Sequence, residues 1–341
     1  MNNKKICPNK YGRRGEIMKK IIAICAALAV MVSCLAGCGK TSDTTQIRIG
    51  SLKGATSMGL LFLMEEAENG QAEGNYAFTM ATQADELLPL MVKGEMDIAL
   101  VPANVASVLY NKMEGQLAVI DINTLGVLYM VTGDPAVTGV EDLRGRTIYL
   151  TGKGTTPDYV LHYIMSENGL TEADYTLEYK SEASEVAALL AQMPEAVGLL
   201  PQPFVTAACM QNEALSVVLD MNEEWTGLQG EGGSRMVTGV TVVRKEFLEE
   251  HEAAVETFLK EHEESAAAIN EDAQTGASLA VEAGIVAKEP IAQKAIPACN
   301  ITCIRGEEMK QALSGYLEVL FEQNPDAVGG TLPGEDFYYI P

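Results

Sequence analysis

Two loops rich in glycine and threonine contain the residue types best suited to holding a small ligand. The first spans residues 51–58 and the second residues 151–157. Their glycines leave backbone N–H groups open, their hydroxyls donate and accept hydrogen bonds, and each loop has one lysine, so both suit an anionic or polar guest. The candidate ligand-binding residues of the loops are Lys53, Gly54, Thr56, Ser57, Lys153, Gly154, Thr155 and Thr156.

The spacing in these loops excludes two common phosphate-binding motifs. Gly152-Lys153-Gly154 lacks the Gly-x4-Gly-Lys spacing of a P-loop and the Gly-x-Gly-x-x-Gly spacing of a dinucleotide site. Each loop follows an expected strand and opens an expected helix, with Pro157 suited to the first helical position and Thr156 to the cap. The alternative is that both are merely well-capped turns. One such loop in each half of the chain favours a shared cleft.

Three further side chains are weaker candidates for ligand contact. Asn104 follows a buried strand and opens a helix, so it either reaches the ligand or only caps the helix. Gln202 lies between two prolines at an expected strand end, which is a rigid place for a polar side chain. Tyr129, in the strand at 127–131, is a candidate aromatic contact.

The sequence shows none of the usual catalytic signatures. It has no Gly-x-Ser-x-Gly elbow, no His-Glu-x-x-His and no paired carboxylates in a recognisable frame. His162 lies mid-helix beside two tyrosines and is interpreted as a structural histidine. We therefore expect no enzyme activity, no cofactor and no metal.

Alternating strands and helices must position the two loops. Short apolar runs separated by helical segments are typical of open, mainly parallel sheets with helices on both faces, the α/β class. Ligands of such sheets bind beyond the carboxyl ends of the strands, where helix N-termini point. Strands are expected at 46–50, 76–80, 97–101, 117–122, 127–131, 147–150, 176–179, 196–200, 216–219 and 240–243, and helix through most of 246–322.

The N-terminal segment is typical of an exported lipoprotein. Lys19 and Lys20 precede an apolar run from Ile21 to Leu35, and the segment Leu35-Ala36-Gly37-Cys38 resembles a bacterial lipobox. The run of about 15 residues is shorter than the roughly 20 that a membrane-spanning helix needs. We interpret residues 1–17 as a mis-assigned start or extension, 18–37 as a signal peptide, Cys38 as the lipidated residue and 38–45 as a tether.

Composition excludes several classes of partner. The net charge of −23 argues against nucleic acid or an anionic lipid surface as a partner. Removing the leader leaves about 300 residues, enough for two domains. Cys299 and Cys303 have the spacing of a bridge or of half a metal site, but no histidine lies close in sequence, so the interpretation of buried thiols is favoured.

Three segments resemble the binding proteins of nitrate/sulfonate/taurine (NitT/TauT) ABC importers. They are Gly94-Glu95-Met96-Asp97-Ile98-Ala99, Leu143-Arg144-Gly145-Arg146-Thr147-Ile148 and Lys245-Glu246-Phe247-Leu248. The similarity runs from about Ile47 to Ile269. These segments are moderately specific for the type II periplasmic binding protein fold and do not specify a ligand.

The resemblance implies a clamp of two lobes that closes on a small ligand. Lobe 1 would be residues 46–125 plus 237–341 and lobe 2 residues 126–236, with the two glycine/threonine loops facing each other. A ligand-driven hinge closure would present the cargo to an ABC permease and its ATPase subunit. The protein would be an extracytoplasmic monomer, held at the bacterial cell membrane through its lipid alone.

The ligand loops depart from the best-known members of that family, so the resemblance does not carry over a substrate. Some subgroups of the family bind thiamine pyrimidines, typically with many aromatic residues around the site. This sequence offers only three obvious aromatic candidates, which are Tyr129, Tyr159 and Trp225. Two alternatives remain open. One is an exported binding module or sensor without transport. The other is an enzyme of thiamine-pyrimidine or menaquinone biosynthesis on a related fold, although those enzymes are cytosolic.

Overall fold

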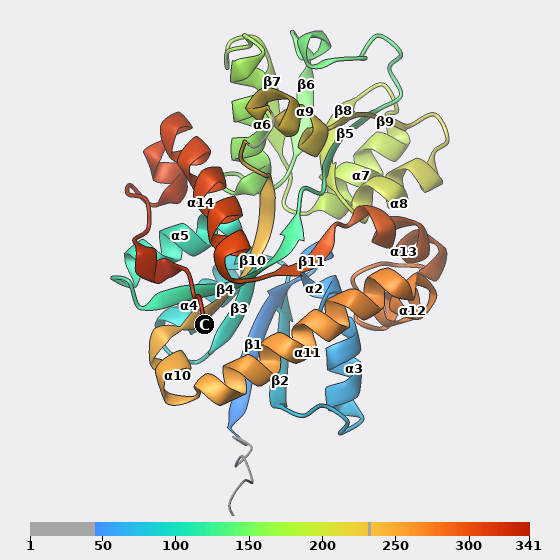
Figure 1. Ribbon diagram of the computed structural model, residues 1–341. Helices are drawn as coiled ribbons and strands as arrows, with labels where there is room; N and C mark the ends of the chain where they lie inside the picture. The colour runs from blue at the N-terminus through green and yellow to red at the C-terminus, as the bar shows by residue number, and fades with distance from the viewer. Residues whose placement is uncertain (1–44, 231–232) are drawn as a thin grey trace, which may run out of the picture. The chain divides into compact units, whose positions relative to one another are not determined.

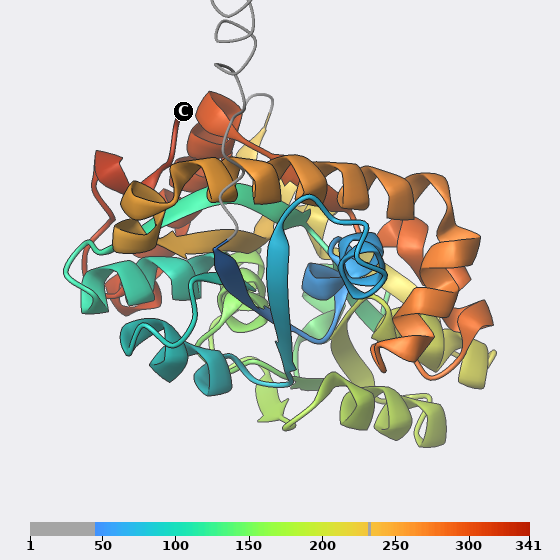
Figure 2. The same ribbon diagram turned by 90° about the horizontal axis from the view of Figure 1, so that it is seen from below.

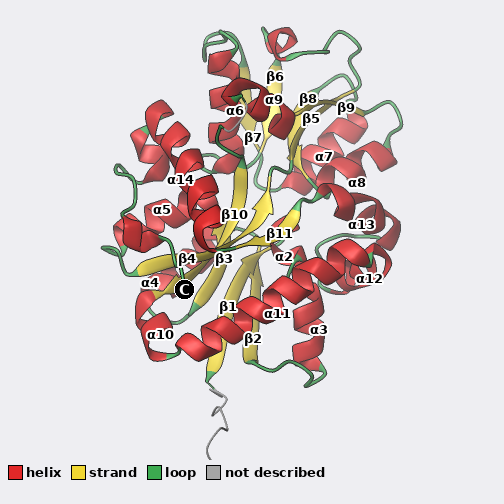
Figure 3. Cartoon of the chain, in the orientation of Figure 1, coloured by secondary structure: helices red, strands yellow, loops and turns green. Residues whose placement is uncertain are grey.

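The computed structural model describes residues 45–230 and 233–341, which form two β-sheets with helices on both faces (Figures 1 and 3). The α/β class expected from the sequence is therefore confirmed. The predicted leader, the predicted lipidation site Cys38 and the predicted tether up to residue 44 lie outside the described residues.

The larger sheet has six strands in the order β11-β4-β10-β3-β1-β2. Its first four strands precede the strands of the smaller sheet in sequence, and its last two follow them. Their bounds are Gln46–Leu52 for β1, Asn75–Ala81 for β2, Ile98–Pro102 for β3, Leu117–Leu125 for β4, Val237–Arg244 for β10 and Ile301–Ile304 for β11.

The smaller sheet has five strands in the order β7-β6-β8-β5-β9. All five come from the middle of the chain, between β4 and β10. Their bounds are Leu128–Thr132 for β5, Thr147–Leu150 for β6, Thr176–Tyr179 for β7, Val197–Pro201 for β8 and Ser216–Asp220 for β9.

Both sheets are mixed, whereas the sequence predicts mainly parallel ones. Strands β1, β2 and β3 are parallel, as are β6, β7 and β8, but β10 and β11 in one sheet and β5 in the other run antiparallel to their neighbours. Strands β5 and β10 are those by which the chain passes from one sheet to the other. A strand that enters a sheet from the end where the other strands leave it must run in the opposite direction.

The helices connect these strands and cover the sheets. Their bounds are Ala55–Met58 for α2, Leu61–Glu68 for α3, Ala84–Val92 for α4, Ala103–Lys112 for α5, Thr156–Glu167 for α6, Ala183–Gln192 for α7, Phe204–Gln211 for α8, Met221–Gln229 for α9, Lys245–Glu250 for α10, Glu252–Glu271 for α11, Ala273–Glu282 for α12, Glu289–Ala295 for α13 and Gly306–Gln323 for α14. Four short 3-10 turns lie at Val140–Leu143 (η1), Ile296–Ala298 (η2), Pro325–Val328 (η3) and Glu335–Phe337 (η4).

Alternation along β3 explains how one sheet carries two cores. Ile98 and Leu100 pack with α3 and α11 on one face, while Ala99 and Val101 pack with α4, α5 and α14 on the other. All four side chains are fully buried, as expected for an apolar strand covered on both sides. Figure 2 shows the long helix α11 on one side of the sheet and α4 and α5 on the other.

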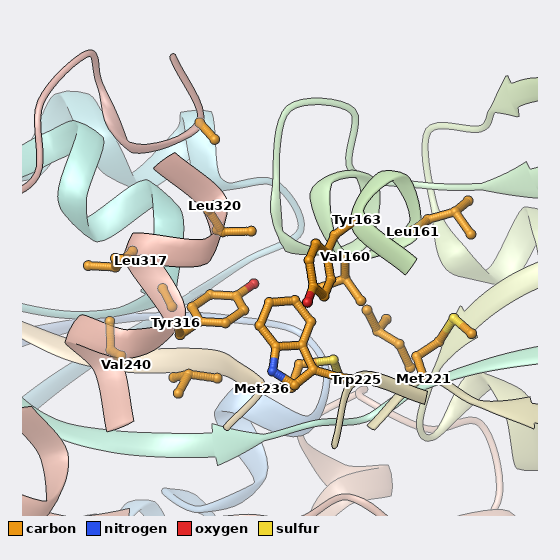
Figure 4. Packing of buried hydrophobic residues seen from close by; sticks show 14 of the residues in the cluster. Val160, Leu161, Tyr163, Met221, Trp225, Met236, Val240, Tyr316, Leu317 and Leu320 are labelled. Atoms are coloured by element: carbon orange, nitrogen blue, oxygen red, sulfur yellow. The ribbon is translucent and has the colours of Figure 1, made fainter. Parts of the chain in front are cut away.

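An aromatic cluster joins helices that belong to different sheets. Trp225 of α9 has its ring 4.6 Å from that of Tyr163 of α6 and 5.2 Å from that of Tyr316 of α14, between ring centroids (Figure 4). Helix α14 packs on β4 and β10 of the six-stranded sheet, whereas α6 and α9 cover the five-stranded one. The core therefore continues from one sheet to the other.

One expectation for the C-terminal third needs correction. The sequence predicts helix through most of residues 246–322, but β11 interrupts it as an edge strand beside β4. Trp225, one of the aromatic candidates named from the sequence, lies in α9 and is fully buried. Among the described residues, no helix combines the length and the apolar composition needed to cross a bilayer.

Candidate functional site

A cavity of about 690 Å³ lies where the carboxyl ends of strands from both sheets meet. Leu52, Pro102 and Pro201 end the strands β1, β3 and β8, and all three line it. Thr151 follows β6 and also lines it. This is the place where open α/β sheets hold ligands.

Several helices begin at the cavity, so their backbone N–H groups point toward it. The N-cap residues that line it are Gln83 of α4, Pro102 of α5, Thr155 of α6 and Glu182 of α7. Phe204, the first residue of α8, lines it as well. Free N–H groups and the positive ends of helix dipoles favour an anion or the negative end of a polar group.

The side chains lining the cavity are mostly hydroxylic or apolar. The hydroxyl-bearing residues are Thr56, Thr82, Thr124, Thr151, Thr155, Thr156, Ser181, Ser184 and Thr238. Val127, Leu128, Ile285, Val286 and Phe204 add apolar surface. Of the described residues that line the cavity, only Lys53 and Glu182 carry ionisable side chains.

Three of the four candidates in the first loop lie at the cavity. Lys53, Gly54 and Thr56 line it, with the Thr56 hydroxyl donating to Leu52 O at 3.1 Å. Ser57 points into the protein, where its hydroxyl donates to Ser51 Oγ at 2.8 Å and it is fully buried. Ser57 thus fixes the start of α2 and does not line the cavity.

The second loop divides between the cavity and the opposite side. Gly152, Thr155 and Thr156 line the cavity, and the Thr155 hydroxyl donates to Gly152 O at 2.6 Å. Gly152 has φ of +75°, a conformation that glycine adopts without strain. The helix cap is Thr155, one residue before the residue predicted from the sequence. Lys153 and Gly154 line a different cavity.

That second cavity, of about 620 Å³, lies beside a hydrogen-bonded cluster centred on Asp158. Asp158 accepts from the backbone N–H of Gly154 at 2.7 Å and from the Tyr179 hydroxyl at 2.5 Å, while His162 Nε2 is 3.3 Å away. Burial alone would raise the pKa of Asp158, but these bonds outweigh it and lower the pKa. Lys153 lies over the Tyr179 ring, 5.4 Å from its centroid.

His162 has a partner on each ring nitrogen, as its interpretation as a structural histidine requires. The second partner is the Tyr175 hydroxyl, 3.0 Å from Nδ1. The hydrogen bond to Asp158 raises the pKa of His162. The network anchors the second loop to α6, because Asp158 holds Gly154.

Asn104 lies beside the cavity without lining it, and its side chain connects the second loop to Ala327. Its Nδ2 donates to Gly154 O at 3.3 Å and to Ala327 O at 3.2 Å, and the side chain is almost fully buried. The Thr156 hydroxyl lies 3.5 Å from Asn104 Oδ1. Asn104 therefore positions the second loop from the N-terminus of α5.

Gln202 lines the cavity and Tyr129 does not. Gln202 Oε1 accepts from the Thr206 hydroxyl at 2.9 Å and from the Thr206 N–H at 3.3 Å, which leaves the amide nitrogen for a guest. The peptide bond between Gln202 and Pro203 is cis. Tyr129 donates to Ala298 O at 3.3 Å, and burial raises its pKa to about 12.

Sequence reasoning missed three cavity-lining segments. Thr82–Ala84 and Ser181–Ser184 lie between a strand end and a helix start, the same pattern that singled out the two loops. That pattern was a usable signal. The segment 281–287, which runs from the end of α12 toward α13, returns to the cavity from the helical C-terminal third and shows no such pattern.

The solved structures that this chain resembles share the two-lobed fold. A protein described as an ABC transporter from Parabacteroides distasonis has a TM-score of 0.72 at 24% identity, over 86% of this chain and 99% of that one. The periplasmic aliphatic sulphonate binding protein SsuA from Escherichia coli has a TM-score of 0.69 at 16% identity, over 87% and 92%. The periplasmic nitrate-binding protein NrtA from Synechocystis has a TM-score of 0.61 at 10% identity, over 84% of each chain. The fold predicted from the sequence is confirmed.

Comparison of the sequence with curated proteins gives no match. The profile of a family described as "Menaquinone biosynthesis" matches residues 59–294, which is more than half of the chain. The matched range includes the whole five-stranded sheet, the six-stranded sheet except β1 and β11, and most of the cavity's lining. The chain therefore belongs to the family described as menaquinone biosynthesis, and it has the two-lobed fold of the periplasmic binding proteins.

Proposed function

We propose that the protein is an extracytoplasmic solute-binding protein that delivers a small anionic or polar organic ligand to an ABC importer. The observation that carries this is the cavity itself, which both sheets line with helix N-termini and hydroxyls. Such donors bind a ligand by orienting it, without a nucleophile or a base. The NitT/TauT type of the importer remains part of the proposal.

The ligand class follows from the charges at the cavity. The protein as a whole is strongly acidic, with a net charge of −23, yet the cavity offers one lysine, one glutamate and several helix N-termini. Local donors of this kind outweigh a distant surface charge because that charge is screened by solvent. Apolar side chains such as Ile285 and Phe204 suit an organic portion of the ligand.

Two hydrogen bonds join the lobes, one at the cavity and one beside it, and support a closing clamp. Gln83 Nε2 donates to Ser181 O at 2.7 Å, and Asn104 Nδ2 donates to Gly154 O. In each bond the donor precedes residue 125 and the acceptor lies in 126–236, the lobe boundaries proposed from the sequence. A ligand that contacts both sides favours this arrangement over an open one.

A thermal-shift screen of the purified protein tests the proposed function. The panel contains nitrate, bicarbonate, taurine, alkanesulfonates, aromatic carboxylates and thiamine pyrimidines. A ligand at 100 times its Kd adds about 2.7 kcal/mol to the free energy of unfolding, a shift of several degrees in Tm. Stabilisation by one chemical class supports the proposal and identifies the ligand class.

Lys53 is expected to contribute strongly to binding if the ligand is an anion. For a ligand found in the screen, Lys53→Ala should weaken binding by about 1.5–3 kcal/mol, or roughly ten- to a hundred-fold in Kd. Glu182→Gln should strengthen it, because that change removes the negative side chain from the lining. Isothermal titration calorimetry measures both effects.

Lys153→Ala is the matched comparison for Lys53. The sequence predicts that Lys153 contributes to binding, whereas its ammonium group lies over Tyr179, beside the second cavity. An unchanged Kd for Lys153→Ala with a weakened Kd for Lys53→Ala assigns the ligand to the cavity between the sheets. The reverse pattern would move the ligand site to the second cavity.

The second candidate function is an enzyme of menaquinone biosynthesis, which the description of the family favours. The discriminating experiment incubates the protein with a bound ligand and analyses that ligand by mass spectrometry. Quantitative recovery of unchanged ligand supports a binding protein. Conversion into a product, with turnover beyond one equivalent, supports the enzyme.

The extracytoplasmic location rests on the N-terminal sequence and gives a separate prediction. Cys38→Ala should release the protein from the membrane fraction, because no thiol then remains at that position to receive the lipid. Fractionation and immunoblotting of the native host or of a bacterial expression strain measures this. Cys34→Ala, a change inside the apolar run, is the control and should leave the protein in the membrane fraction. Membrane retention of the Cys38 variant would contradict the anchor.

A further inference from the structure

Three side chains that are far apart in sequence meet between the six-stranded sheet and helix α11, away from the ligand cavity. They are Asp121 of β4, His262 of α11 and Cys303 of β11, and their ligand atoms all lie within 4.8 Å of one another. Asp121 and His262 are completely buried, and Cys303 is partly buried. None of the three lines the cavity between the sheets.

The carboxylate is held in place by hydrogen bonds on both oxygens. Asp121 Oδ2 is 3.1 Å from His262 Nδ1, and Asp121 Oδ1 accepts from the Thr241 hydroxyl at 2.8 Å. Asn123 in turn donates to the Thr241 hydroxyl at 3.1 Å. Metal ligands typically have such supporting bonds, which fix the orientation of the donor atom.

One ring nitrogen of His262 is left without a partner in the described part of the chain. His262 Nε2 is buried and has no hydrogen-bond partner among the described residues, so a proton at that nitrogen would be costly. The nearby cation, Arg305, is engaged by Glu256 at 2.8 Å.

Burial raises the pKa of the Cys303 thiol, and the Asp121 carboxylate adds to the effect. The thiol is therefore protonated at neutral pH when the cluster contains only protein. A divalent cation among the three donors reverses this, since metal binding displaces the proton from a thiol. The carboxylate and the thiolate then carry two negative charges, which match the +2 charge of the cation, and the neutral imidazole adds none.

We propose that Asp121, His262 and Cys303 form a Zn²⁺ site. Sulfur, nitrogen and oxygen donors suit zinc, whereas magnesium and calcium prefer oxygen alone. Ligands of a tetrahedral zinc ion lie about 3.5 Å apart, so donors that are within 4.8 Å need only a small inward shift. Only the thiol proton of Cys303 leaves when the metal binds, and the neutral imidazole keeps its one proton on the ring nitrogen that does not bind the metal. Zinc has no redox chemistry, so no electron donor or acceptor is required.

The metal would fasten an edge strand to the sheet. Strand β11 pairs with β4 at Ile301 and Ile304, with an irregularity between these positions, and Cys303 lies within it. The strand follows α13 and leads into α14, the helix that carries Tyr316. A zinc ion bound by β4, β11 and α11 would tie the edge strand, which pairs with β4 at only two positions, to its neighbours. Its role would therefore be structural.

Metal-binding measurements on the tag-free, full-length protein after dialysis against a chelator test the site. Equilibrium dialysis with elemental analysis should show about one Zn²⁺ per chain, and Zn²⁺ should raise the Tm. Substitution with Co²⁺ should give a thiolate-to-metal charge-transfer band in the near ultraviolet. That band reports a Cys ligand directly, and ligand binding in the cavity between the sheets should not require the metal.

Cys303→Ala and Cys299→Ala form the matched pair of variants. Both cysteines are free, but Cys299 is fully buried against Met58, with its Sγ 3.7 Å from the methionine sulfur, and lies outside the cluster. Cys303→Ala should lose the charge-transfer band and the Tm shift, while Cys299→Ala keeps both. A Zn²⁺-free wild-type protein, or equal metal binding by the Cys303 variant, would overturn the proposal.

Discussion

Replacing Trp225 with alanine is expected to lower the free energy of unfolding by about 3–5 kcal/mol. The side chain is fully buried, and its rings pack against Tyr163 on one side and Tyr316 on the other. Its Nε1–H donates to Ser234 O at 3.0 Å. Truncation removes the contact surface and leaves a cavity that α6, α9 and α14 cannot fill without moving.

Chemical denaturation followed by circular dichroism measures this loss. Trp225→Phe keeps most of the aromatic surface and should cost clearly less. Met193→Ala is the exposed control, since that side chain is 54% accessible and its removal should change stability by less than about 0.5 kcal/mol. A loss below about 1 kcal/mol for Trp225→Ala would contradict the packing across the two sheets.

The same variant should also affect ligand binding, because the cluster lies between the helices of the two sheets. Helix α14 packs on the six-stranded sheet and contacts α6, which begins at the cavity. Loosening this contact releases the start of α6 from its position. We expect weaker binding, and so a higher Kd, for Trp225→Ala than for Met193→Ala, measured at a temperature where both variants are folded.

Replacing Asp97 with alanine is the second large expected effect, a loss of about 3 kcal/mol. Asp97 is almost fully buried between two arginines. Arg48 binds its carboxylate through Nε at 2.8 Å and Nη2 at 2.5 Å, and Arg244 Nη2 lies 3.1 Å away. Removing the carboxylate leaves Nη2 of the largely buried Arg244 without Asp97, while its Nη1 keeps the bond to Glu246. The loss stays at the lower end of the range for buried pairs because Arg48 reaches solvent.

Asp97 also gives the protein an acid-sensitive contribution to stability. Burial alone would raise the pKa of Asp97, but the hydrogen bonds from Arg48 and Arg244 outweigh it and lower the pKa below its ordinary value of 3.8. A carboxyl with a depressed folded-state pKa stabilises the protein above its unfolded-state pKa. That contribution disappears as the pH falls through the folded-state pKa.

Denaturation curves at a series of pH values check both statements. Wild-type stability should fall below about pH 4 more steeply than that of Asp97→Ala, which lacks this carboxyl. Glu95→Ala, an exposed acid two residues away, is the control and should follow the wild type. Identical pH profiles for wild type and Asp97→Ala would show that the arginines do not stabilise the charged form.

Much of the framework could be predicted from the sequence, because it depends on local patterns. The apolar runs marked ten of the eleven strands within a few residues, and β6 and β7 have the predicted bounds. The exception is β11, whose four residues lie among strong helix formers and pair only at the sheet edge. A helix cap shifted by one residue at α6, where Thr155 stands in place of the predicted Thr156.

The site was predictable where a strand end meets a helix start. Lys53, Gly54, Thr56, Thr155, Thr156 and Gln202 satisfy that condition and line the cavity. Side-chain direction is a different matter, because it depends on the partners that the fold supplies. Ser57 turns to Ser51 and Lys153 to Tyr179, and neither partner can be identified from sequence spacing.

The sequence by itself determined the α/β class, the order of the strands along the chain and the loops that reach their carboxyl ends, since hydrophobic period and turn residues are local properties. Only the tertiary structure decided the direction of β5 and β10, the return of residues 281–287 to the cavity, and the meeting of Asp121, His262 and Cys303. Each of these depends on contacts between segments far apart in the chain, where packing and hydrogen bonding select the partners.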